Sequence, residues 1–83
     1  MKEFTWKSRR LGFMDHQYGE AAKRWKDETH DDRCGFVNLY NRMVQALETL
    51  PDEPDLYLRN ALDEKLTRDW KTLDEIMMRF DGR

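Results

Sequence analysis

Residues 36–50 constrain the fold of this 83-residue chain more than any other segment. Apolar side chains recur there with helical spacing and fill one side of a helical wheel, while polar side chains fill the other. An apolar arc of about 180° is wider than the roughly 100° stripe that one packing neighbour requires. We therefore predict a central helix that contacts at least two others, with Asp31 or Asp32 as its N-cap and Pro51 as its stop. Its apolar members are Phe36, Val37, Leu39, Tyr40, Met43, Val44, Ala46, Leu47 and Leu50.

A first helix is predicted upstream, because apolar residues there step by three and four along one face. Ser8 or Asp15 is available to cap its start, and the acidic segment 27–32 is expected to end it. The predicted stripe comprises Leu11, Met14, Tyr18, Ala21, Ala22 and Trp25.

A third helix is predicted downstream, with Asp52 as its cap, Pro54 in its first turn and Gly82 at its end. As one helix of about 26 residues it would be near 39 Å long, whereas a compact globule of this chain length is about 30 Å across. The helix is therefore expected to protrude or to break. Its apolar face comprises Leu58, Leu62, Leu66, Trp70, Leu73, Ile76, Met77 and Phe80.

The position of a break would be Thr72, because residues 72–75 form a capping-box pattern. Opposite charges four residues apart run through this point and favour a continuous or kinked helix. We predict an all-α bundle of three helices, or four if the last helix breaks near Thr72. The charge pairs are Glu64–Arg68, Lys71–Glu75 and Glu75–Arg79.

Composition supports one folded helical domain over residues 1–83, with 1–13 as a possible lead-in segment. Val, Ile and Thr supply only eight residues and never alternate with polar residues over the length of a strand. Charged residues make up 39% of the chain, but the net charge of −2 is too small to favour disorder. No apolar run approaches the roughly 20 residues of a membrane span. With Cys34 as the sole cysteine, no intrachain disulfide can form, and we expect a cytoplasmic protein.

Residue types that support catalysis do not occur in a recognised arrangement. The one Ser and the one Cys lack a nucleophile motif, and the four Gly are too scattered to form a phosphate-binding loop. His16, His30 and Cys34 lack the spacing of a zinc site, even with Asp31 and Asp32 nearby. We therefore expect no enzyme activity, no metal and no cofactor, and we interpret Cys34 as an incidental exposed cysteine.

Charge is distributed unevenly along the chain. Residues 1–26 carry seven basic and three acidic side chains, and residues 27–83 carry eight and fourteen. Basic residues interleaved with aromatic rings are typical of single-strand nucleic-acid binding, which is one candidate function. Glu20 and Asp27 interrupt the basic face and weigh against it. The basic residues are Lys2, Lys7, Arg9, Arg10, Lys23, Arg24 and Lys26.

Several apolar residues fall outside the predicted stripes, and they suggest a protein-binding surface. Phe4 and Trp6 precede the first helix, and Phe13 projects off its stripe. These rings either complete the core or, together with arginines, contact a partner. We predict a non-catalytic interaction module, such as an inhibitor, an adaptor or a regulatory subunit, with a phage or mobile-element accessory protein as one candidate. The expected partner is a protein with an acidic surface, and a homodimer is possible. The predicted partner-binding residues are Trp6, Arg9, Arg10 and Phe13, followed by Leu56, Tyr57 and Met78.

Overall fold

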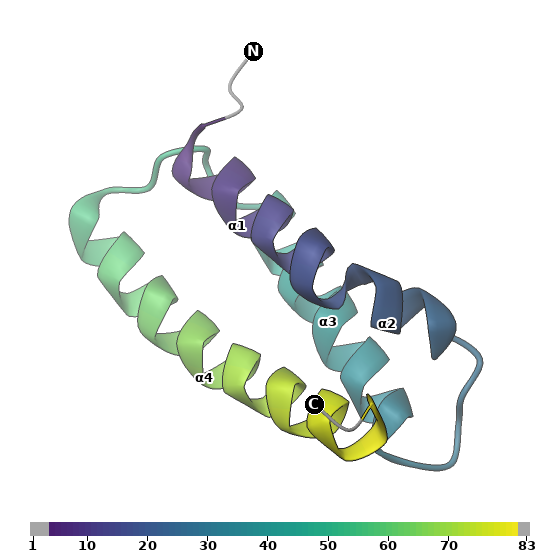
Figure 1. The fold of residues 1–83 in the computed structure, drawn as a ribbon. Helices are drawn as coiled ribbons and strands as arrows, with labels where there is room; N and C mark the ends of the chain where they lie inside the picture. The colour runs from purple at the N-terminus through teal and green to yellow at the C-terminus, as the bar shows by residue number, and fades with distance from the viewer. Residues whose placement is uncertain (1–3, 82–83) are drawn as a thin grey trace.

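The computed structural model describes residues 4–81, and every regular element within this range is a helix (Figure 1). Three consecutive elements join end to end into one rod, and two further helices complete the bundle. The predicted all-α bundle of three helices is therefore confirmed. The first rod comprises α1 (Trp6–Met14), the π-helical turn η1 (Asp15–Gly19) and α2 (Glu20–Arg24), and it is followed by α3 (Asp32–Glu48) and α4 (Leu56–Asp81).

The first rod begins earlier than the sequence pattern predicts. The hydroxyl of Thr5, and not Ser8 or Asp15, forms the N-cap by accepting a hydrogen bond from the Ser8 amide at 3.1 Å. Trp6 therefore lies in the helix and in the core, and the predicted lead-in segment is helical from this residue onward. Lys2 lies outside the described residues.

Gly19, the last residue of the π-helical turn η1, lies close to Tyr40 of α3. A Cβ atom on Gly19 would lie 3.4 Å from the hydroxyl of Tyr40 and 2.9 Å from Oδ1 of Asp15. Glycine therefore fits where the rod passes Tyr40, and the widened turn keeps Met14 and Tyr18 buried on the same side.

The predicted central helix is confirmed as α3, which packs against both the first rod and α4. Asp31 is its N-cap and accepts a hydrogen bond from the Arg33 amide at 2.9 Å. The helix ends at Glu48, shortly before Pro51. Figure 1 shows that α3 runs antiparallel to the first rod and to α4.

Helix α4 is a single helix of 26 residues without a break at Thr72. It neither breaks nor protrudes, because the molecule is elongated, with extents of 39 × 25 × 21 Å, and the other rods run beside it. Asp55, and not Asp52, caps its start by accepting a hydrogen bond from the Leu58 amide at 2.9 Å. Pro54 therefore precedes the cap, and the predicted stop at Gly82 lies outside the described residues.

The charge pairs predicted along α4 do not form among residues 4–81. Lys65 instead pairs with Asp69 at 3.3 Å, and Arg79 pairs with Asp32 at the start of α3. Glu64 and Lys71 are consequently exposed without an ion-pair partner in the described chain.

The core is a continuous apolar cluster between the three rods, and aromatic edges form its centre. The ring of Phe36 contacts Trp25 and Tyr18, with ring centroids 5.1 and 6.1 Å apart. The predicted stripes supply these residues, apart from Trp6. The buried members are Trp6, Met14, Tyr18, Ala21, Ala22, Trp25, Phe36, Met43, Leu47, Leu66 and Leu73. Over residues 4–81, none of the helices has the length and apolar character needed to cross a membrane.

Candidate protein-interaction surface

A pocket of about 380 Å³ lies where α1 and α4 begin, and we call it the end pocket. It brings together four of the seven predicted partner-binding residues, three from the start of α1 and Leu56 from the start of α4. Its lining comprises Phe4, Trp6, Arg9, Arg10, Glu53, Leu56, Arg59, Asn60 and Asp63.

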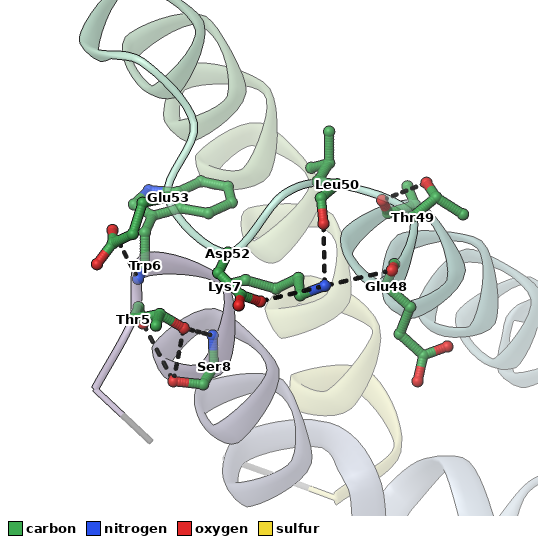
Figure 2. Close-up of polar contacts among 10 residues, drawn as sticks. Thr5, Trp6, Lys7, Ser8, Glu48, Thr49, Leu50, Asp52 and Glu53 are labelled. Atoms are coloured by element: carbon green, nitrogen blue, oxygen red, sulfur yellow. Dashed lines mark hydrogen bonds and ion pairs between the residues drawn. The ribbon is translucent and has the colours of Figure 1, made fainter. Parts of the chain in front are cut away.

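The linker between α3 and α4 holds this end of the bundle together (Figure 2). The Lys7 amide donates to the carbonyl of Asp52 at 3.0 Å, and the Trp6 amide donates to Oε1 of Glu53 at 3.2 Å. The Lys7 ammonium donates to the carbonyl of Leu50 at 2.9 Å and lies 3.5 Å from the Asp52 carboxylate. It also reaches the carbonyl of Glu48 at 3.4 Å, so it caps the last turn of α3.

Trp6 and Arg10 support the end pocket from within. Trp6 is only 5% exposed, and its indole Nε1 has no hydrogen-bond partner among the described residues. Arg10 forms a two-pronged ion pair with Asp63, with Nε and Nη2 both 3.1 Å from Oδ1, and its guanidinium lies 4.9 Å from the Trp6 ring centroid. Arg10 therefore ties α1 to α4, and Trp6 is buried, so neither predicted anchor is freely available to a partner.

Phe4, Arg9 and Leu56 are exposed members of this site, as are Glu53 and Asn60. Phe4 is 77% exposed and Leu56 is 69% exposed, although both are large and apolar. The exposed guanidinium of Arg9 makes no hydrogen bond or ion pair with the described residues. We call these three side chains, together with the end pocket, the end surface.

Phe13 lies one helical turn beyond Arg9 and is half-exposed. Its ring packs edge-on against Trp70, with centroids 4.7 Å apart, and the Trp70 indole donates to the Met14 sulfur at 2.9 Å. Phe13 therefore covers the seam between α1 and α4 and borders the end surface.

Tyr57 and Met78 do not line the end pocket, although both are exposed, at 87% and 62%. Tyr57 follows Leu56 and points about 100° away from it around the helix. Met78 lies about 32 Å further along α4. The predicted second group of anchors is therefore divided between different faces.

The basic residues of the first third do not form a continuous track. Lys7 and Arg10 are held in the contacts described above, whereas Lys23 and Lys26 line a hollow of about 230 Å³ beside Tyr40, toward the other end of the rod. Arg9 in α1 is therefore separated along the length of the first rod from Lys23 and Lys26.

A groove between α3 and α4 was not predicted from the sequence. It has a volume of about 470 Å³ and a mostly apolar lining. The wide apolar arc of α3 was the available signal, because neither neighbouring rod covers all of it. The lining comprises Leu39, Arg42, Met43, Ala46, Leu47, Leu62, Lys65, Leu66 and Asp69.

The acidic residues near Cys34 serve structural contacts. Asp31 accepts hydrogen bonds from the Arg33 side chain and amide, which lower the pKa of its carboxyl group. Cys34 is half-buried, and its sulfur accepts a hydrogen bond from the Asn38 amide at 3.6 Å. In the part of the chain that the structure describes, no three His, Cys, Asp or Glu residues are grouped to hold a metal ion.

Comparisons with protein-family models, with curated proteins and with solved structures find no match for this chain.

Proposed function

We propose that the protein is a non-catalytic interaction module that binds a partner protein through the end surface. One observation carries this proposal: the exposed side chains of Phe4 and Leu56 line the same pocket as Arg9, whose guanidinium has no ion-pair partner among the described residues. Large apolar side chains and arginines are the residues that contribute most to protein–protein binding energy.

The rigid frame beneath the end surface supports the same proposal. The Arg10–Asp63 ion pair and the Lys7 contacts hold α1, α4 and the linker together before any partner arrives. A surface that is already ordered loses less conformational entropy on binding.

The preferred partner is a protein with an acidic, partly apolar surface. Arg9, Arg10 and Arg59 outnumber the two carboxylates of the end pocket, Glu53 and Asp63. Such complementarity accelerates the encounter and makes it sensitive to salt. An inhibitor, adaptor or regulatory subunit acting in the cytoplasm, where Cys34 stays reduced, fits this proposal.

Nucleic-acid binding is the alternative, and it has less support. Phosphate contacts need accessible cations along one path, but Lys7 and Arg10 are occupied and the remaining cations are divided between two regions. Tight binding to single-stranded oligonucleotides that weakens steeply with salt would favour this alternative.

The test compares capture of partners from a lysate of the native host by wild-type protein and by an Arg9→Ala/Leu56→Ala variant. Neither side chain contributes to the core, so we expect an unchanged melting temperature and at least a tenfold loss of the specific partner by quantitative mass spectrometry. Met78→Ala removes a similarly exposed apolar side chain far from the end pocket and is the matched control. Undiminished capture by the double variant would contradict the proposal.

A further inference from the structure

Helix α4 carries four exposed side chains at intervals of seven residues: Tyr57, Glu64, Lys71 and Met78. We call them the outer row. Seven residues make nearly two helical turns, so the four side chains share one face with a drift of about 20° per interval. Leu66 and Leu73 lie about 200° around the helix from Glu64 and Lys71, and both are buried. The outer row therefore lies on the side of α4 opposite the core, with Met78 about 60° around the helix from Tyr57.

None of these four side chains makes an ion pair or side-chain hydrogen bond with another described residue. Tyr57 and Met78 are the two most exposed large apolar side chains of α4 apart from Leu56. Glu64 and Lys71 make no ion pair with other residues in the described range 4–81. Two apolar side chains thus lie at the ends of a row whose two opposite charges have no ion-pair partner among residues 4–81.

The order of the outer row is self-complementary when it is reversed. If two copies of α4 lie antiparallel about a twofold axis between positions 67 and 68, Tyr57 of one copy faces Met78 of the other. In the same register, Glu64 of one copy faces Lys71 of the other. Each contact occurs twice, as a closed symmetric dimer requires. We propose that the outer row is a homodimer interface in which two copies of α4 pair antiparallel in this register.

Other registers of the same row bring like charges together or fail to close. A shift of seven residues in one direction places Glu64 against Glu64, and a shift in the other direction places Lys71 against Lys71. A parallel pair in register produces both repulsions. A parallel pair shifted by seven residues matches Glu64 with Lys71, but it is not symmetric and leaves an unused row on each copy.

The chemistry of the row indicates a weak dimer that depends on salt. The central ion pairs are exposed to solvent and contribute little each. The Tyr57–Met78 contacts at both ends combine apolar burial with a favourable contact between sulfur and an aromatic ring. The end surface does not include the outer row, so this inference stands independently of the proposed function.

A cysteine cross-linking experiment tests the register. In a Cys34→Ser background, Tyr57→Cys and Met78→Cys are made as separate proteins with tags of different mass. Positions 57 of the two copies lie about 32 Å apart in the proposed dimer, so neither variant forms a disulfide efficiently with itself. A mixture should form the mixed disulfide at least tenfold faster, and the opposite end of that dimer keeps its Tyr57–Met78 contact. Homodisulfides that form as fast as the mixed species would overturn the proposal.

Charge reversal gives a second readout that does not depend on cysteine chemistry. At low salt, Glu64→Lys and Lys71→Glu should each raise the dimer dissociation constant at least tenfold in sedimentation equilibrium, because each places like charges at two contacts. The Glu64→Lys/Lys71→Glu variant should return to within threefold of wild type. Lys23→Glu makes the same charge change on α2 and should leave the constant unchanged. A wild-type protein that stays monomeric up to about 1 mM at low salt, a concentration at which weak complexes form, would overturn the proposal.

Discussion

The hydroxyl group of Tyr18 connects the first rod to α4. It donates a hydrogen bond to Oδ1 of Asp74 at 2.9 Å from a side chain that is almost wholly buried. Burial, the hydrogen bond to Asp74 and the negative charge of that carboxylate all raise the pKa of Tyr18 above its ordinary value of 10.0. The folded protein therefore retains the phenol proton at a pH where the unfolded chain releases it.

This shift predicts a loss of stability in alkaline solution. The contribution of Tyr18 is complete below the ordinary pKa of 10.0 and declines above it, because ionisation then favours the unfolded chain. We expect the free energy of unfolding to fall more steeply between pH 10 and 12 for wild type than for Tyr18→Phe, as measured by urea denaturation. Tyr40, whose pKa is also raised, should leave a residual slope. Identical slopes for both proteins would contradict this account.

Individual residues show which features the local sequence pattern predicts and which it does not. Leu56, Tyr57 and Met78 fall outside the apolar stripe of α4, and their exposure follows from helical spacing alone. Thr5 and Ser8 are both suitable caps, so local sequence does not select between them. The selection depends on the burial of Trp6 and on its contact with Glu53, a residue 47 positions away.

At the scale of elements, Lys7 connects the start of α1 to the end of α3. Its ammonium satisfies carbonyl groups that a helix end leaves without partners, and it lies at the negative end of the helix dipole. Lys7→Met keeps the aliphatic stem and removes the charge. We expect a loss of about 1 kcal/mol in the free energy of unfolding, measured by chemical denaturation.

A matched change elsewhere on the rod isolates the effect of the helix end. Lys23 is exposed on α2, so Lys23→Met should change stability by less than about 0.5 kcal/mol. Equal losses for the two variants would show that the Lys7 contacts contribute nothing specific.

The spacing of the apolar residues was sufficient to predict α3 and α4, because a long stripe that repeats every three or four residues fits a helix and not a strand. It did not predict η1, since the spacing from Met14 to Tyr18 suits an α-helical or a π-helical turn equally well. The end pocket could not be predicted from this spacing either, because Phe4 and Leu56 come together only when the first rod packs beside α4. Local spacing carries no information on which helix ends meet.

At the scale of the whole molecule, one thin core supports the entire fold. Leu47 is 2% exposed in the middle of the apolar arc of α3. Leu47→Ala should cost roughly 2–5 kcal/mol. A domain of this size has only about 5 kcal/mol to lose, so the variant should be partly unfolded near physiological temperature. Circular dichroism during heating checks this, and an unchanged melting curve would show that the core lies elsewhere.

The elongated shape explains why the predicted length conflict did not arise. A spherical globule of this chain length would be about 30 Å across, which is shorter than a helix near 39 Å. Three rods packed side by side form instead a body 39 Å long and 21 to 25 Å wide. The first rod and α3 lie along α4, so the length of α4 determines the length of the molecule.

The alternation of rod directions has a mechanical consequence. Since α3 runs opposite to its two neighbours, Phe4 and the end of α4 lie at opposite poles of the bundle. Tension applied between these poles acts along the helix axes. Under this tension the helices must slide past one another along their whole length. The contacts between them cannot be broken one at a time. A tether attached at both poles therefore loads the bundle in shear.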